Sequence, residues 1–449
     1  MNPVRTFGAL LCLCVVPFVA TADWLQFRGP QASGQTTGAR TPVEWNVETG
    51  SNILWKAAVP GLGHSAPIVV GDRVFVTSAI NDSGKADLKV GLYGDIGAAQ
   101  DNGNQKWVLF CFDRNTGARL WEQVAHEGAP AIKRHTKATH ANSTPASDGQ
   151  RVVAFFGSEG LHCYTIDGKP VWKKSLGKLD SGYFKSPTAQ WGFASSPVIE
   201  DGKVLVQCDV QTNSFIAAFN LGDGTELWRT RRQEVPTWCT PTVAEVSGKK
   251  VVLINGYKHA GAYDFATGKE LWKLSGGGDI PVPTPIVAHG LAFFTSAHGP
   301  FAPIYAVHPG SKGDLTLPSG VTTNAGIVWS VPRKGNYMQT PIVVGDLLFC
   351  CNDAGTLSCY DARSGKLHFQ ERISPTADGY SASPVASHGR IYFTSEQGKV
   401  RVLLAVNTFK VEATNDLGET CMATPAISKG VIFFRTRSLL IAAGTRPVP

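Results

Sequence analysis

The chain has 449 residues and 43% of them are apolar, so it can bury a large core. Charged residues make up only 17% and the formal net charge is +7, without a long Lys/Arg run, which argues against a disordered chain and against nucleic-acid binding. The 48 glycines and 27 prolines indicate many short strands joined by turns.

The first 22 residues have the features of a secretory signal peptide. Arg5 precedes the apolar run FGALLCLCVVPFVA, and the small residues Ala20 and Ala22 stand just before Asp23. The run is short for a membrane span, and no later segment approaches about 20 apolar residues. We therefore expect cleavage after Ala22 and a secreted or periplasmic mature protein without an integral membrane segment, with an uncleaved anchor as the alternative.

A short phrase recurs eight times along the rest of the chain. It consists of a small or polar residue, a proline and an apolar run, as in SAPIVV from Ser65 and QTPIVV from Gln339. Repetition at intervals of 41 to 78 residues indicates an array of similar structural units. The prolines of the phrase are Pro67, Pro145, Pro197, Pro241, Pro285, Pro341, Pro384 and Pro425.

Each unit reads as four short strands. The apolar run after the proline is followed by a Gly-containing turn, two further strands, and a turn such as DFATGKELW at 264–272 that leads into the fourth strand. Four strands in about 44 residues are typical of a β-propeller blade. We interpret the aromatic residues at the fourth strands as structural groups that fill the wedge between blades. They are Trp55, Trp121, Trp172, Trp228, Trp272, Trp329 and Phe369.

The eighth unit lacks its fourth strand, because the stretch from Cys421 onward supplies about three strands and no Trp. The segment ILWKAAV at 53–59 can supply the missing strand from the N-terminal part of the chain. One sheet built from both chain ends would close the ring and remove its open edge. The sequence therefore predicts an all-β fold over residues 23–449: a single eight-bladed β-propeller of four-stranded antiparallel blades.

The turn pattern D-x-x-T/S-G-x-x-x-W resembles the tryptophan-docking repeat of pyrroloquinoline-quinone (PQQ) propellers. The opening WLQFRGPQASG at 24–34 and the phrase YSASPVASHGRIYFTSEQG at 380–398 are similar to secreted PQQ-binding-like β-propeller repeat proteins. Relatives of that group include quinoprotein alcohol dehydrogenases and BamB-like propellers of outer-membrane assembly. The resemblance covers nearly the whole mature chain, and it implies either a binding scaffold or a quinone enzyme.

We place the candidate ligand site at the top of the propeller, where the loops before the first strands and between the second and third strands meet. Segment 79–105 is a long insertion of this kind, and long loops on a rigid scaffold often carry function. The basic stretch 130–142 favours an acidic or carboxylate-bearing ligand, with a solvated loop as the alternative. The aromatic residues fit a sugar, quinone or peptide surface, or packing around the axis. The candidate binding residues are His64, Lys133, Arg134, His135, His140, Trp191, Trp238, Lys258, His298, Tyr337 and Tyr380.

Motifs for metal binding or catalysis are not apparent. The sequence contains no HExxH motif, no paired CxxC motifs and no GxSxG elbow, so we expect no metal site and assign no catalytic residue. The adjacent Cys350 and Cys351 could form a redox-active ring or be two small apolar residues of a strand. Because successive strand residues point to opposite faces, we favour unpaired cysteines.

We therefore expect a non-catalytic scaffold that binds protein or cell-envelope partners through its top face and needs no cofactor. The alternative is a PQQ-dependent dehydrogenase that oxidises an alcohol or a sugar. The resemblance to such enzymes would then imply bound PQQ with calcium, and a role near the quinone for Trp191, Trp238 and the pair Cys350 and Cys351.

Overall fold

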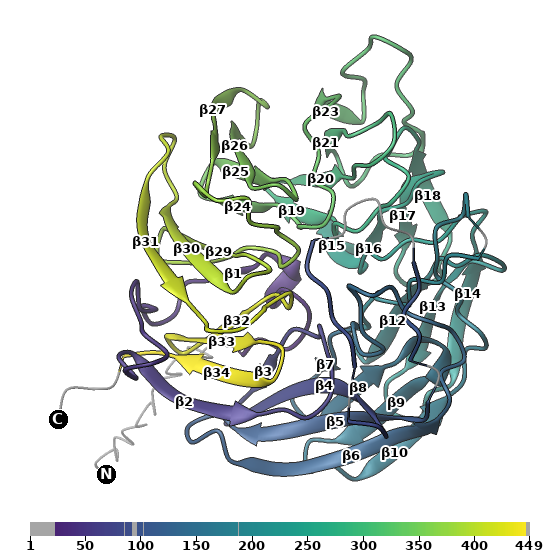
Figure 1. Cartoon of the computed structure of the whole chain (residues 1–449). Helices are drawn as coiled ribbons and strands as arrows, with labels where there is room; N and C mark the ends of the chain where they lie inside the picture. The colour runs from purple at the N-terminus through teal and green to yellow at the C-terminus, as the bar shows by residue number, and fades with distance from the viewer. Residues whose placement is uncertain (1–22, 85, 92–96, 102, 187, 446–449) are drawn as a thin grey trace, which may run out of the picture.

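The computed structural model describes residues 23–84, 86–91, 97–101, 103–186 and 188–445, so the predicted signal peptide at 1–22 lies outside the described residues. These residues form eight sheets around a common axis (Figure 1), which confirms the predicted all-β, eight-bladed propeller. The described part also contains two short 3-10 helices, η1 (Pro30–Ala32) and η2 (Gly157–Glu159). Within these ranges, no helix has the length and apolar character needed to cross a membrane.

Blades 1 to 4 follow one another along the chain, each with its first strand nearest the axis. Blade 1 contains β3 (Ile68–Val70), β4 (Arg73–Asn81), β5 (Gln105–Asp113) and β6 (Arg119–Gly128). Blade 2 contains β7 (Ala146–Ser147), β8 (Arg151–Phe155), β9 (Leu161–Thr165) and β10 (Pro170–Lys174). Blade 3 contains β11 (Val198–Glu200), β12 (Lys203–Cys208), β13 (Phe215–Asn220) and β14 (Glu226–Arg231). Blade 4 contains β15 (Thr242–Val246), β16 (Lys249–Ile254), β17 (Ala260–Asp264), β18 (Glu270–Leu274) and, at its outer edge, β22 (Gly313–Asp314).

Blades 5 to 8 complete the ring. Blade 5 contains β19 (Ile286–Ala288), β20 (Leu291–Thr295), β21 (Ile304–Val307) and β23 (Ile327–Val331). Blade 6 contains β24 (Ile342–Val344), β25 (Leu347–Cys351), β26 (Thr356–Asp361) and β27 (Leu367–Arg372). Blade 7 contains β28 (Val385–Ser387), β29 (Arg390–Thr394), β30 (Lys399–Leu404), β31 (Val411–Asp416) and, beside β28, β1 (Gln35–Thr36). Blade 8 contains β32 (Ala426–Ser428), β33 (Val431–Arg435), β34 (Leu439–Ala443) and β2 (Ile53–Ala58).

Blade 8 is built from both ends of the chain, as the sequence predicted. Strand β2 pairs antiparallel with β34, so that Trp55 lies opposite Ala442 and Lys56 opposite Ile441. Figure 1 shows β2 beside β34, with the early and late parts of the chain meeting in one sheet. The pairing joins the ends of the ring and leaves no gap between blades 7 and 1 at which a strand edge would be exposed.

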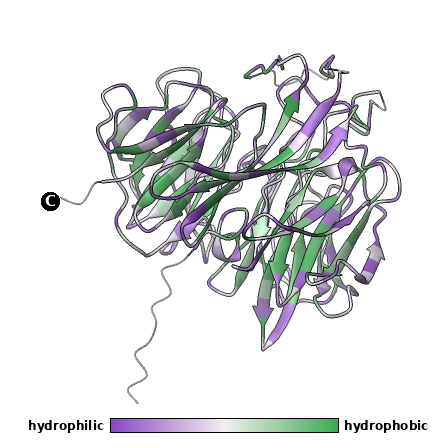
Figure 2. Ribbon diagram, turned by 90° about the horizontal axis from the view of Figure 1, so that it is seen from below, coloured by the Kyte–Doolittle hydropathy of each residue, from purple (hydrophilic) through white to green (hydrophobic). Residues whose placement is uncertain are grey.

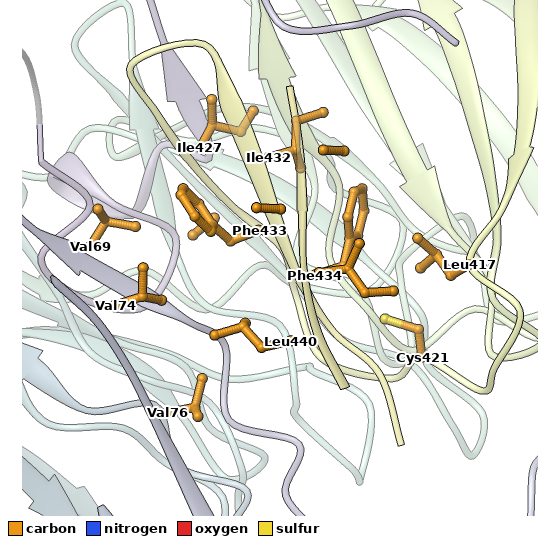
Figure 3. Close-up of a cluster of buried hydrophobic side chains, with 14 of the residues drawn as sticks. Val69, Val74, Val76, Leu417, Cys421, Ile427, Ile432, Phe433, Phe434 and Leu440 are labelled. Atoms are coloured by element: carbon orange, nitrogen blue, oxygen red, sulfur yellow. The ribbon is translucent and has the colours of Figure 1, made fainter. Parts of the chain in front are cut away.

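The core lies between neighbouring blades, because the pleat of each strand sends alternate side chains to the two faces of its sheet. On β33, Phe433 faces Val69 and Val74 of blade 1, whereas the next residue, Phe434, lies on the side of Leu417 and Cys421 (Figure 3). Figure 2 shows the hydrophobic residues concentrated in the strands. Each blade therefore supplies apolar side chains to two interfaces, and stability is shared around the ring.

The predicted docking tryptophans lie between blades. The indole N–H of Trp329 in blade 5 donates to the carbonyl oxygen of Ala362 in blade 6 at 3.0 Å, and the ring packs against Gly365 of the same turn. Phe369 instead packs on Phe349 and Phe409. Comparable indole N–H to carbonyl bonds join Trp55 to Arg114, Trp172 to Leu221, Trp228 to Phe265 and Trp272 to Pro309, while Trp121 packs against Gly168.

The N-terminal segment 24–36 fills the lower part of the central channel, at the end where the first and second strands of the blades are joined. Trp24 exchanges backbone hydrogen bonds with Val69, and β1 runs parallel to β28. Arg28 is fully buried, and its guanidinium donates to four backbone oxygens rather than to a carboxylate. Burial lowers its pKa to about 9. This closure of the channel was not predicted from the sequence.

Candidate ligand-binding site at the top of the axial channel

A cavity of about 360 Å³ lies on the axis above the N-terminal segment. Its wall is formed mainly by residues that precede the inner strands of the blades, and Phe27 of the N-terminal segment lines its lower end. His298, on the loop between β20 and β21, contributes to the rim. The volume lies within the range of ordinary small-ligand pockets.

A ring of hydroxyl groups surrounds this cavity. In seven blades the residue before the repeated proline is Ser or Thr, and its oxygen accepts a hydrogen bond from the backbone N–H of the equivalent residue in the preceding blade, at 2.9–3.2 Å. Ala66 of blade 1 has no hydroxyl, so the ring is open at that blade. The seven residues, which all line the cavity, are Thr144, Ser196, Thr240, Thr284, Thr340, Ser383 and Thr424.

Aromatic rings form an arc along one side of the cavity. Tyr183 stacks on Trp191 with ring centroids 5.4 Å apart and an interplanar angle of 2°, and Trp238 lies 5.6 Å from Trp191. His298 meets the edge of Tyr183 at 5.7 Å and stacks on Tyr337 at 5.8 Å. The indole N–H of Trp238 donates to the carbonyl oxygen of Gly192, and this bond fixes its ring. These rings therefore form a continuous surface rather than a set of separate side chains. We call this surface the aromatic arc, and its members are Tyr183, Trp191, Trp238, His298 and Tyr337.

A buried carboxylate holds part of the aromatic arc in place. Asp279 accepts hydrogen bonds from Nδ1 of His298 at 2.5 Å and from the hydroxyl of Tyr183 at 3.1 Å, and it also pairs with Lys185. Burial would raise the pKa of Asp279, but the hydrogen bonds from Lys185 and His298 outweigh it and lower the pKa. His298 has a φ of 82°, a conformation that is costly for a residue with a side chain. The bond to Asp279 fixes its ring at the rim.

The opposite wall contains a second buried ion pair. Nζ of Lys137 lies 2.5 Å from Oε1 of Glu396, whose side chain is fully buried and also accepts from the hydroxyl of Ser381. Burial opposes ionisation, but the Lys137 ammonium lowers the pKa of Glu396 below its ordinary value. Next to this pair, Nε2 of His64 contacts the carbonyl oxygen of Lys137 at 2.9 Å. Burial lowers the pKa of His64 to about 4, so its ring is neutral near pH 7.

The structure brings six of the candidate binding residues together at the cavity. They are His64, His135, Trp191, Trp238, His298 and Tyr337. Lys133 and Lys258 are exposed outside the cavity lining. The repeat pattern of the sequence thus placed these eight residues at one end of the channel, but it did not separate the six that line the cavity from the two that lie outside the lining.

Arg134, His140 and Tyr380, the remaining candidate binding residues, are not among the residues that line the cavity. Arg134 is buried and pairs with Asp101 at 2.6 Å, and His140 lies between Asp101 and the ring of Trp107. Tyr380 is fully buried in the core between blades 6 and 7. Asp101 belongs to the long insertion, so a distant segment determines these environments.

Carboxylates pair with basic side chains around the cavity mouth and reduce the positive charge that the basic stretch 130–142 would present to an acidic ligand. Lys137 pairs with Glu396, Lys185 with Asp279, and Arg134 with Asp101. The described part of the long insertion crosses this region, where the N–H of Gly91 donates to Oε2 of Glu396 and the N–H of Ala99 donates to the carbonyl oxygen of Arg134. The insertion thus stabilises the rim through these hydrogen bonds, and its Asp101 carboxylate offsets the positive charge of Arg134.

Several cavity residues were missed by sequence reasoning. Tyr183 lies in a long loop without a counterpart in other repeats, and Phe27 comes from the N-terminal segment, whereas Lys137 belongs to the basic stretch 130–142 but was not among the candidate binding residues. The hydroxyl ring could have been found, because Ser or Thr precedes the proline in seven of the eight phrases. A Ser or Thr that recurs at one position of a repeat indicates that its hydroxyl makes the same contact in each blade, and this signal becomes visible only when the repeats are compared with one another.

Cys350 and Cys351 are free thiols inside the blades. Cys350 belongs to the cluster between blades 5 and 6, and Cys351 to the cluster between blades 6 and 7. The two side chains therefore point to opposite faces of β25. Burial raises the pKa of both thiols, and neither residue lines the axial cavity.

The cavity lining does not fit PQQ with calcium. PQQ carries three carboxylates, whereas Lys137 is the one described lining residue with a fixed positive charge, and it already pairs with Glu396. Calcium requires oxygen ligands that usually include carboxylates, but no described residue of the lining is Asp or Glu. Elsewhere in the described ranges, no cluster of three or more His, Cys, Asp or Glu side chains could hold a metal ion.

The chain is similar in sequence to outer-membrane assembly factors. A family model described as outer membrane protein assembly factor BamB matches residues 104–370. BamB of Yersinia pestis is 20% identical over 333 residues, which are 73% of this chain and 67% of the relative. BamB of Escherichia coli K12 is 22% identical over 277 residues, or 59% of this chain and 63% of the relative. The chain thus spans about two thirds of the length of these relatives.

Solved structures share the fold at low sequence identity. BamB from Moraxella catarrhalis has a TM-score of 0.54 at 12% identity, with coverage of 84% of this chain and 99% of that one. Quinohemoprotein alcohol dehydrogenase from Comamonas testosteroni has a TM-score of 0.61 at 12% identity, with coverage of 96% and 82%. These likenesses concern the fold alone. Because the family model covers more than half of the residues, the chain belongs to the BamB family of PQQ-repeat β-propellers.

Proposed function

We propose that the protein is an extracytoplasmic binding scaffold that holds a protein or cell-envelope partner at its top face without catalysing a reaction. The aromatic arc at the mouth of the axial cavity carries this proposal, because half-buried Tyr and Trp rings are typical of binding surfaces. The named relatives are outer-membrane assembly factors, and the predicted signal peptide would place this chain in the same part of the cell.

The arc is preorganised for binding. Asp279 fixes His298 and Tyr183, the carbonyl of Gly192 fixes Trp238, and the closed ring holds all of these groups on rigid blades. A partner would therefore meet a surface that loses little conformational entropy when it binds. A scaffold with such a preorganised face can bind a partner without a conformational change of its own.

Site-specific photocrosslinking in the source cells tests the proposal. A photoreactive side chain at Phe301, which is 52% exposed on a loop between second and third strands, should crosslink to a partner. The same group at Asp346, on the turn between β24 and β25 at the other end of the channel, serves as the control. We expect crosslinks from position 301 alone, and expect Trp191→Ala to remove them. Equal crosslinking from both positions, or none from 301, would contradict a top-face scaffold.

The dehydrogenase alternative can be tested separately. Adding PQQ and calcium to the purified mature protein should give neither a saturable quinone spectrum nor alcohol- or sugar-dependent dye reduction, because the cavity lining lacks the charges that PQQ and calcium require. Saturable PQQ binding with turnover would overturn the scaffold proposal in favour of an enzyme.

A further inference from the structure

We propose that the axial cavity binds a neutral, polyhydroxylated ligand, namely the terminal units of an uncharged oligosaccharide. This inference names the ligand class of the top-face site, and so it rests on the proposed function of that face. Three independent features of the cavity support it: the hydroxyl ring, the aromatic arc and the pairing of the surrounding charges.

The hydroxyl ring offers hydrogen bonds of the kind that sugars use. Each of the seven oxygens accepts one backbone N–H, as Thr240 does from Ser196 and Thr284 from Thr240. Within the described part of the chain, no protein acceptor takes the hydrogen of these seven hydroxyls, and all of them line the cavity. Each group can therefore donate its own hydrogen into the cavity and accept there with its second lone pair. Sugar hydroxyls are likewise both donors and acceptors.

The aromatic arc adds an apolar surface to the hydrogen-bonding groups of the hydroxyl ring. The face of an aromatic ring is the negative part of its quadrupole, and it attracts the slightly positive C–H groups on the flat side of a sugar ring. Trp191 and Trp238 are half-buried with their ring centroids 5.6 Å apart, at the mouth of the same cavity that the hydroxyls line. A ligand with alternating C–H and O–H groups satisfies both surfaces at once.

The charges around the cavity argue against an ionic ligand. Lys137 is paired with buried Glu396, and Lys185 and His298 are paired with buried Asp279. His64 is neutral near pH 7 because burial lowers its pKa to about 4. An anion would have to compete with a buried carboxylate for its cation, and breaking a buried ion pair leaves one charge without compensation. A neutral ligand leaves both pairs intact.

The position of Phe27 determines how such a ligand would enter. Phe27 lines the lower end of the cavity and belongs to the segment that fills the channel beneath it. Among the described residues, this segment obstructs the lower end of the cavity, so a ligand would enter from the top face. We infer that the cavity receives the end of an oligosaccharide rather than an internal stretch of it.

Glycan binding by the mature protein tests the inference. The probes are immobilised neutral oligosaccharides of glucose, galactose, mannose and N-acetylglucosamine units, with oligogalacturonates and acidic peptides as charged comparisons. Titration of a neutral glycan that binds should change the tryptophan fluorescence saturably. We expect Trp191→Ala to weaken binding at least tenfold, and Trp191→Phe to weaken it less because a ring remains. Phe301→Ala, outside the cavity lining, should bind as the unaltered protein does, and it serves as the matched control.

The outcomes separate this inference from the proposed function. If no neutral glycan binds while position 301 still crosslinks to a partner in cells, the ligand class is wrong and the top-face scaffold stands. If the oligogalacturonates or acidic peptides bind instead, and Trp191→Ala weakens them, the site takes anions and the inference is also overturned. If a neutral glycan binds equally to Trp191→Ala, the binding lies outside the axial cavity and contradicts the inference.

Discussion

Gly365 of blade 6 lies directly against the indole ring of Trp329 of blade 5. A Cβ atom at Gly365 would stand 2.6 Å from Cδ2 of Trp329, and the φ of Gly365 is 73°. The glycine is therefore required both by the turn and by the docked ring. We predict that Gly365→Ala lowers the free energy of unfolding by roughly 2–4 kcal/mol, through overpacking and backbone strain together. Urea denaturation followed by circular dichroism would measure it.

Gly345 provides a matched control for this prediction. Its φ is 58°, but a Cβ atom there would meet nothing within 4 Å. Gly345→Ala should therefore cost only the backbone strain, about 1–2 kcal/mol. Equal losses for the two variants would show that contact with Trp329 contributes nothing, and would contradict the docking interpretation of the repeat.

The fold could be predicted because the same sequence pattern for a four-stranded blade occurs several times along the chain. The recurring proline phrase and the Gly-Trp turn occur at similar places in most units, so an error in reading one unit is corrected by the others. The closing strand was also predictable, since the strand-like segment 53–59 with Trp55 precedes the first repeat and the last repeat lacks a tryptophan. The channel-filling segment was not, because its buried Arg28 is satisfied by backbone carbonyls that no sequence pattern marks.

The candidate site could be predicted less well than the fold. Residues adjacent to inner strands, such as Trp191 and Trp238, reach the cavity because the repeat frame fixes their position. Arg134 and Tyr380 do not, because their surroundings depend on packing between segments far apart in the chain. The repeat frame shows which end of the channel a residue occupies, whereas burial and pairing depend on contacts that are not local.

The hydroxyl ring should contribute to stability as well as to the cavity wall. Thr284 accepts the backbone N–H of buried Thr240 at 3.2 Å. Thr284→Val keeps the shape but leaves that N–H without an acceptor, which should lower the free energy of unfolding by roughly 1–3 kcal/mol. Thr284→Ser keeps the hydroxyl and should cost about 1 kcal/mol or less. Thermal and urea denaturation of both variants would measure the difference, and a Ser variant less stable than the Val variant would contradict this role.

His64 should make the protein less stable in mild acid. Burial lowers its pKa to about 4, whereas an unfolded histidine titrates near 6.5, so the folded state favours the neutral ring. The resulting stability is present above about pH 6.5 and is lost as the pH falls from there to about 4, by at most about 3 kcal/mol. His64→Gln should flatten part of this decline in urea denaturation between pH 7 and pH 4. The exposed His308→Gln serves as control, and an unchanged slope in His64→Gln would contradict the prediction.

Cys350 and Cys351 should behave as ordinary buried thiols. Each is enclosed by a different core cluster, and burial raises the pKa of both, so neither forms a reactive thiolate near pH 7. We predict that iodoacetamide labels these cysteines only after unfolding, and that reduction does not change the mass of the peptide that contains both. A gain of two hydrogens on reduction, localised to that peptide, would show a disulfide and reverse the assignment.

The N-terminal segment should be an integral part of the propeller, because Arg28 ties it to two blades. Its guanidinium donates to the carbonyl oxygens of Pro341 and Pro384, both at 2.9 Å, and those carbonyls belong to the proline phrases of blades 6 and 7. A lysine ammonium cannot reproduce the planar set of donors, so Arg28→Lys should leave buried carbonyls unpaired and cost roughly 2–4 kcal/mol. Urea denaturation would measure the loss, with exposed Arg40→Lys as the control. Similar stability of the two variants would mean that the segment closes the channel without supporting the ring.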